Sequence, residues 1–132
     1  MDLHLKVIGI LLIILAVSHT FFPSYFKWKH ELNGLSMINR QMFYVHSFFI
    51  AFSVLLMGVL CLTSTRELLA THLGKKVLLG LGIFWVARLC IQLFGYSSKL
   101  WKGKSFETSV HIFLIVLWAY LSGVFIYSFL GI

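Results

Sequence analysis

Four long apolar runs constrain this chain more than any other feature of its sequence. They cover residues 7–22, 42–62, 77–96 and 110–130. An α-helix rises about 1.5 Å per residue, so runs of about 20 residues match the roughly 30 Å hydrocarbon core of a bilayer. Backbone groups in lipid must be satisfied within the segment, and none of the runs alternates with the period of two that a barrel strand needs. The sequence therefore predicts four membrane-spanning helices.

Composition excludes the other classes of protein. The apolar share of the 132 residues is 60% and the charged share is 11%, whereas soluble domains have about 45–50% and about 25%. An ordinary soluble domain, a disordered chain and a disulfide-stapled secreted module are all excluded on this ground. The net charge is +7, and the basic residues do not form a soluble basic domain. This charge therefore predicts attraction to anionic lipid headgroups and no binding of nucleic acid.

The expected fold class is all-α, an integral membrane four-helix transmembrane bundle, in a single transmembrane domain over residues 1–132. Pro23 is expected to end the first helix, because proline lacks the backbone N–H that a helix interior uses. The predicted helices are approximately 3–22, 40–62, 76–97 and 107–130.

An internal repeat accompanies this fold. The second and fourth apolar runs align without gaps, so that His46 corresponds to His111, and in each run a glycine follows the histidine twelve residues later. A weaker alignment of the first and third runs sets His19 opposite Gln92. If the chain arose by duplication, it consists of two tandem helical hairpins.

Polar side chains gather at one depth, about one turn inside the same end of all four predicted helices. A hydrogen-bonding or ionisable group at one level in every helix is unusual in an apolar bundle and predicts a ligand site in one leaflet. At this level, at its rim and, for Arg88, one turn below it, the residues expected to bind a cofactor or ligand are His46, His111, Arg88, Gln92 and Arg40.

Arg88 is the only Lys, Arg, Asp or Glu inside the four apolar runs. An arginine in the middle of a spanning helix costs at least about 2.5–3.5 kcal/mol and usually marks function. One interpretation is a structural ion pair with Glu107 that fixes the third helix against the fourth. The other is that Arg88 receives an anionic group, such as a lipid phosphate, a carboxylate or a haem propionate.

The histidines suggest two cofactors. His46 and His111, at equal depth on alternate helices, could supply the two axial imidazoles of haem b. The arrangement resembles in outline the b-type cytochrome bundle, whose second and fourth helices carry the haem ligands, although that family has two such histidines per helix and this chain has one. Together with His19 they form a three-imidazole metal set that suits copper. No methionine cluster or cysteine-rich motif supports copper, so haem is the favoured cofactor.

Three function classes follow from these residues. The first is a haem- or metal-binding redox or ligand-binding membrane protein. The second is an accessory or structural subunit of a larger membrane complex, with partner membrane subunits or a second copy of the chain. The third is a lipid- or quinone-handling membrane enzyme, for which no catalytic residue is assigned. We expect a multi-pass protein of the cell or inner membrane, and six basic residues in the two longer loops against four on the other side favour both termini outside.

Overall fold

The computed structural model describes residues 2–25, 27–95, 103 and 105–131. This part of the chain is helical and contains no strand. Helices long and apolar enough to cross a membrane cover Asp2–Ser24, Met37–Thr63, His72–Gly95 and Ser105–Leu130. The all-α class and the four spans predicted from the apolar runs are therefore confirmed.

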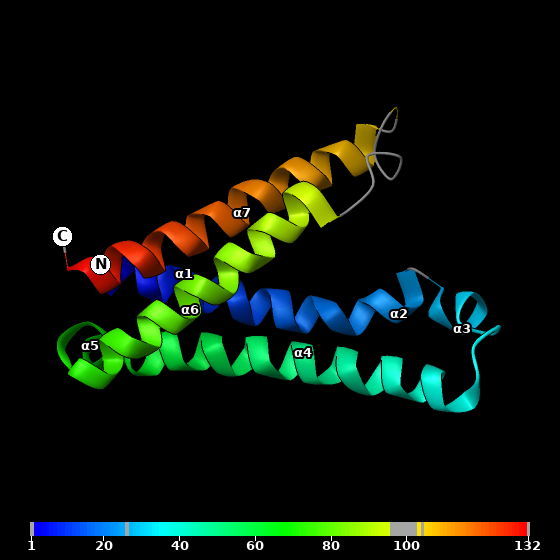
Figure 1. Ribbon diagram of the computed structural model, residues 1–132, viewed down its shortest axis with the longest axis horizontal. Helices are drawn as coiled ribbons and strands as arrows, with labels where there is room; N and C mark the ends of the chain where they lie inside the picture. The colour runs from blue at the N-terminus through cyan, green and yellow to red at the C-terminus, as the bar shows by residue number, and fades with distance from the viewer. Residues whose placement is uncertain (1, 26, 96–102, 104, 132) are drawn as a thin grey trace. The chain divides into compact units, whose positions relative to one another are not determined.

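The chain separates into two compact units, one of Leu3–Thr65 and the other of Arg66–Ile132 together with Met1–Asp2. Each unit is built on a pair of long antiparallel helices (Figure 1), as two tandem hairpins would be. We call them the first and the second hairpin. The single domain over residues 1–132 stays a prediction.

The first hairpin opens with a helix that changes its winding but does not stop at proline. Helix α1 (Asp2–Ser18) passes through a 3-10 turn, η1 (His19–Phe21), into the short helix α2 (Phe22–Tyr25). Pro23 was expected to end the helix and instead lies in the first turn of α2. That position suits proline, because the first turn of a helix leaves its backbone N–H groups without an intrahelical acceptor. A further short helix, α3 (Trp28–Glu31), leads into the second span.

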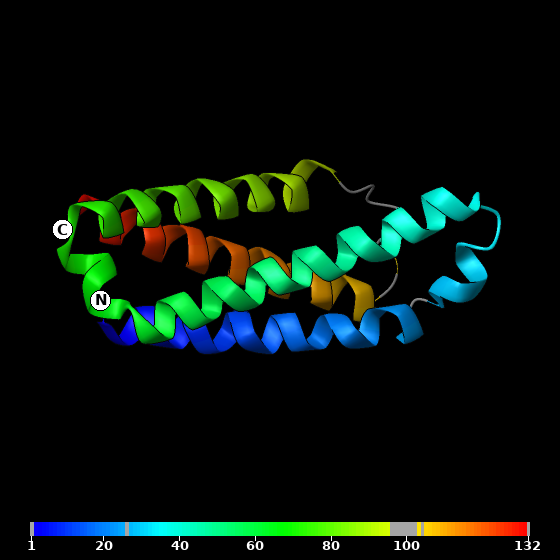
Figure 2. The same cartoon turned by 90° about the horizontal axis from the view of Figure 1, so that it is seen from below.

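Helix α4 (Met37–Thr63) runs antiparallel to α1 (Figure 1), and Figure 2 shows the two helices diverging from the end that holds the N-terminus. Its N-cap is Ser36, whose hydroxyl accepts a hydrogen bond from the backbone N–H of Asn39 at 3.4 Å. The helices meet at two glycines. A Cβ added to Gly9 or to Gly58 would lie 2.8 Å from the carbonyl oxygen of the other. Only the absence of a side chain at both positions allows this close approach.

We expect Gly58→Ala to destabilise the first hairpin by about 1–3 kcal/mol, the usual cost of forcing atoms into a packed contact. The matched control is Gly123→Ala, at the position that the internal repeat pairs with Gly58, because Gly123 is exposed and has no neighbour within 4 Å of its added Cβ. Alanine favours helix over glycine, so the control should be neutral or stabilising. Unfolding of the purified protein by increasing SDS in mixed micelles, followed by circular dichroism, measures both. Equal effects of the two changes would contradict the proposed contact.

The second hairpin begins one residue into the short helix α5 (Thr65–Ala70) and continues with the long helix α6 (His72–Cys90). Thr71 is the N-cap of α6, and its hydroxyl accepts a hydrogen bond from the backbone N–H of Gly74 at 2.9 Å. The cap starts α6 four residues before the expected start at residue 76.

The last turn of the third span is not a regular α-helix. Residues Ile91–Gly95 form a π-helical turn, η2, in which each hydrogen bond spans one residue more than in an α-helix. The sequence predicted a plain helix up to residue 97, and residues 96 and 97 lie outside the described part of the chain. Helix α7 (Ser105–Leu130) packs against α6. Buried apolar side chains of these two helices are Leu78, Leu81, Trp85, Trp118, Leu121 and Phe125.

Candidate functional site

The second hairpin brings two of the predicted site residues into direct contact. The amide nitrogen Nε2 of Gln92 lies 2.7 Å from Nδ1 of His111. Gln92 comes from the π-helical turn η2 and is only 4% exposed, whereas His111 lies in the second turn of α7 and is half-buried. A π-turn changes the direction of the side chains that it carries and is frequent at functional sites.

Two tryptophans complete this contact. The indole N–H of Trp118 donates to Oε1 of Gln92 at 3.3 Å. The Trp118 ring stacks on that of Trp85, with 5.0 Å between ring centroids and 18° between ring planes. Both tryptophans are buried. Neither tryptophan is among the site residues predicted from the sequence, although their spacing is a signal. Trp85 precedes Gln92 by seven residues and Trp118 follows His111 by seven, which is two helical turns along the same face.

Arg88 lies against the same aromatic pair. Its guanidinium carbon is 5.1 Å from the centroid of the Trp118 ring, within range of a cation–π interaction. The side chain is half-buried. Glu107 is exposed and lies eleven residues before Trp118 on α7, a rise of about 16 Å along the helix axis. The ion pair of Arg88 with Glu107 stays a prediction, and the contact described for Arg88 is with Trp118.

The hydrogen bonds determine which ring nitrogen of His111 carries the proton. A tryptophan N–H can only donate, so the oxygen of the Gln92 amide faces Trp118 and the NH₂ group faces His111. The NH₂ group is itself only a donor, so Nδ1 of His111 accepts. In the neutral ring the proton is therefore on Nε2.

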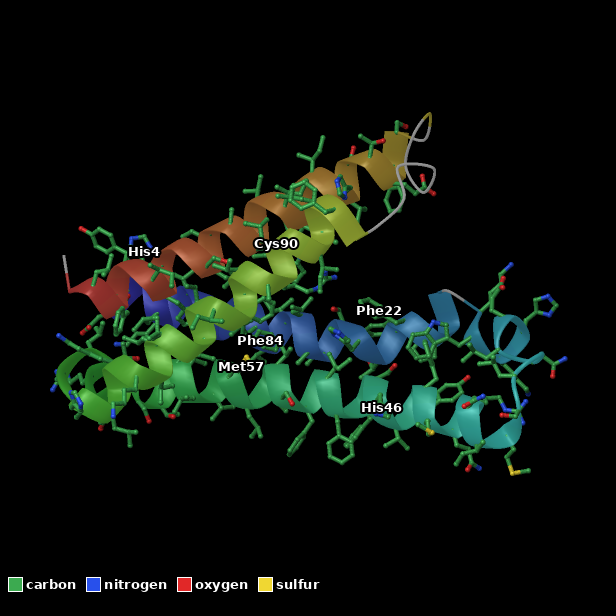
Figure 3. All side chains as sticks on the ribbon, viewed as in Figure 1. His4, Phe22, His46, Met57, Phe84 and Cys90 are labelled. Carbon is green, nitrogen blue, oxygen red and sulfur yellow. The ribbon has the colours of Figure 1, made fainter. Side chains whose placement is uncertain are left out.

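The histidines of the first hairpin have the opposite arrangement. Nδ1 of His19 lies 2.7 Å from the carbonyl oxygen of Leu15, and Nδ1 of His46 lies 2.7 Å from that of Met42. A carbonyl only accepts, so in both rings Nδ1 donates, and in the neutral ring Nε2 keeps its lone pair. His46 is exposed on α4 (Figure 3), and His19 is half-buried with its ring 4.6 Å from that of Phe22.

The predicted site residues thus divide between the hairpins. His19, His46 and the half-buried Arg40 belong to the first, and Arg88, Gln92 and His111 to the second. Among the described residues, no group of three or more His, Cys, Asp or Glu could hold a metal ion. A metal or haem site that draws ligands from both hairpins stays a prediction. We call the five residues that lie in contact in the second hairpin the Gln92 cluster. They are Trp85, Arg88, Gln92, His111 and Trp118.

Comparison of the chain with protein-family models, with curated proteins and with solved structures gives no match. The class of protein is therefore defined by its fold and its site. It is a multi-pass, all-α membrane protein that carries a cluster of cationic, amide, imidazole and indole groups inside one helical hairpin.

Proposed function

We propose that this chain is a ligand-binding membrane protein whose Gln92 cluster holds an anionic oxygen group, such as the phosphate of a lipid headgroup. The observation that carries the proposal is Arg88, a cation inside a spanning helix whose guanidinium lies over the Trp118 ring. Charged groups inside a membrane are costly and mark ligand or ion pathways by default. A guanidinium is also the side chain best suited to paired hydrogen bonds with phosphate or carboxylate.

A second donor supports an anionic ligand. The indole N–H of Trp85 is buried and has no hydrogen-bond acceptor among the described residues. Leaving a buried donor unsatisfied costs about 1–3 kcal/mol, and such a group in a native structure calls for an explanation. Trp85 stacks on Trp118, so its N–H belongs to the same cluster as Arg88. An oxygen-rich anion would provide the acceptor.

The cluster fits an anion better than it fits haem iron or copper. Either metal needs a histidine nitrogen with a lone pair directed at it. The lone pair of His111 is on Nδ1 and accepts the hydrogen bond from Gln92. His46 keeps a lone pair on Nε2, so it meets the requirement that His111 does not. Axial ligation by both histidines would need His111 to give up its bond to Gln92.

Two other functions remain predictions from the sequence. In an accessory subunit of a larger complex, the contact of Arg88 with Trp118 only holds the hairpin together, and its removal changes stability without changing lipid binding. In a lipid- or quinone-handling enzyme, a lipid bound at Arg88 is chemically altered. Measuring binding, stability and the identity of the recovered lipid separates the three.

The proposal is tested by titrating short-chain phosphatidic acid into the purified protein in neutral detergent and measuring heat. Arg88→Gln is expected to weaken binding by about tenfold or more, because a hydrogen bond to a charged group contributes about 1.5–3 kcal/mol. The matched control is Arg66→Gln, which removes the same charge from an exposed position on α5 outside the spans. This control should keep the affinity within about threefold, since exposed charges contribute about 1 kcal/mol or less.

Equal losses in Arg88→Gln and Arg66→Gln would show that the lipid responds only to net charge and would overturn the proposal. So would binding of short-chain phosphatidylcholine as tight as that of phosphatidic acid. The SDS unfolding midpoint of each variant, measured in parallel, shows whether a loss of binding comes from a loss of fold.

A further inference from the structure

We infer that Trp118 and Gln92 hold His111 as a hydrogen-bond donor, and that the Gln92 cluster therefore selects a group that only accepts hydrogen bonds. The ligand class is a deprotonated phosphate or carboxylate oxygen. The choice of ligand rests on the proposed function, whereas the state of His111 does not.

The inference starts from a chain of two hydrogen bonds with a fixed direction. Trp118 has one donor and no acceptor, and it donates to the Gln92 oxygen at 3.3 Å. This leaves the Gln92 NH₂ group to donate to Nδ1 of His111 at 2.7 Å. The proton of the neutral ring is then on Nε2, which acts as a donor toward any group that it meets. Trp118 and Gln92 are positioning residues in this scheme.

Every other arrangement sets two donors against each other. A proton on Nδ1 of His111 would face the NH₂ group of Gln92. Turning the Gln92 amide over would remove that conflict but place its NH₂ group against the N–H of Trp118. Gln92 and Trp118 are 4% and 3% exposed, so water does not readily relieve either conflict, and a buried donor left without an acceptor is costly. The indole of Trp118, which can only donate, thus fixes the orientation of the Gln92 amide, and the amide in turn determines which nitrogen of His111 carries the proton.

The chemistry that the cluster can recognise follows from this. Its donors are the guanidinium of Arg88, the Nε2–H of His111 and the indole N–H of Trp85. The one imidazole acceptor, Nδ1 of His111, takes its bond from Gln92, and the oxygen of the buried Gln92 amide takes a bond from Trp118. A ligand that brings lone pairs therefore matches the cluster best. A phosphodiester or carboxylate does so with a charge opposite to that of Arg88, whereas a metal ion would need the lone pair that His111 has already used.

The state of His111 is tested by nitrogen NMR of protein labelled with ¹⁵N-histidine in micelles. We expect His111 to show a protonated Nε2 and an unprotonated Nδ1. His46 provides an internal reference in the same sample, because its Nδ1 donates to the Met42 carbonyl and its pattern should be the reverse. His111→Gln and His46→Gln assign the two signals. A wild-type spectrum in which His111 carries its proton on Nδ1 would overturn the inference.

Gln92→Glu tests the relay directly. A carboxylate has only acceptors, so it can still accept from Trp118 but now also attracts a proton to Nδ1 of His111. The variant is expected to protonate Nδ1 of His111 and to leave the His46 signals unchanged. An unchanged His111 signal in a variant that keeps its fold by circular dichroism would contradict the role of Gln92.

The ligand class is tested with His111→Gln and His111→Met. The glutamine can still donate from its amide, so it should bind short-chain phosphatidic acid within about threefold of the wild type, whereas methionine should lose about fivefold or more, as expected for one lost hydrogen bond. Inorganic phosphate, titrated alongside, shows whether the anion alone is enough or the lipid chain is needed. Equal affinities of the glutamine and methionine variants, with Arg88→Gln still impaired, would overturn donation by His111 and leave the proposed function standing. Unimpaired Arg88→Gln would overturn the proposed function and leave the NMR result intact.

Discussion

Gly74→Val is expected to destabilise the second hairpin by about 3 kcal/mol or more, at the upper end of what overpacking costs. A Cβ at this position would fall on the backbone of α5, at the carbonyl oxygen of Glu67 and the Cα of Leu68. Backbone atoms cannot turn aside as the end of a flexible side chain can, so α5 or α6 must move as a whole. The same residue donates its N–H to the N-cap Thr71, and a movement of α6 therefore also loses its cap, which contributes about 1 kcal/mol.

The measurement is the midpoint of unfolding by SDS in mixed micelles, with the helical signal followed by circular dichroism. Gly80→Val is the matched control, because Gly80 lies on the same helix, is exposed and has no atom within 4 Å of an added Cβ. Both changes replace glycine with the same β-branched residue, so helix propensity contributes equally. Equal midpoints for the two variants would show that the contact with α5 does not stabilise the hairpin.

Gly74 also shows why the spans could be predicted and the start of the third helix could not. The length of an apolar run is a property of the sequence alone, so it predicts a spanning helix without knowledge of its neighbours. The start at His72, before the expected residue 76, depends on the cap at Thr71 and on the fit of Gly74 against α5. Neither contact can be recognised from apolar pattern, because each depends on which backbone the residue meets.

The candidate site, too, has features that the sequence predicts and features that it does not. Counting residues along the helices predicted that Gln92 and His111 lie at one depth, and the structure brings them into contact. The charge of Arg88 inside an apolar run also marked it for attention. The π-helical turn that carries Gln92 and the indole that orients its amide were not predicted. A π-turn depends on packing against the facing helix, and the proton position of a histidine depends on the partner of each ring nitrogen, which a sequence does not specify.

The internal repeat predicted similar hairpins, and the two differ in their polar contacts. The repeat pairs His46 with His111 and His19 with Gln92. In the second hairpin Gln92 and His111 bond to each other. In the first hairpin their counterparts His19 and His46 each bond to the carbonyl four residues earlier in the chain. An imidazole can satisfy itself on its own helix in this way, but the Gln92 amide reaches across to α7. The two hairpins therefore differ in that the first satisfies its imidazoles within one helix, whereas the second joins α6 and α7 through the Gln92 amide.

Gln92→Leu is expected to have the largest effect of any change in the site. It leaves the N–H of Trp118 and Nδ1 of His111 without their partner, and each unsatisfied group costs about 1–3 kcal/mol. The control is Gln41→Leu, the same chemical change at an exposed position on α4 of the first hairpin. The control should leave the SDS unfolding midpoint close to that of the wild type.

A double-mutant cycle then separates the hydrogen bond from the change in packing. Trp118→Phe removes the buried donor, so the loss caused by Gln92→Leu should be smaller in that background than in the wild type. Coupling energies between polar groups of helices in a bilayer average about 0.6 kcal/mol and reach about 1.7 kcal/mol, and the upper part of this range is expected for a bond between two buried side chains. Additive effects of the two changes would mean that the bond between Trp118 and Gln92 contributes nothing to stability. The amide would then be free to turn, and the direction of the chain that makes His111 a donor would lose its physical basis.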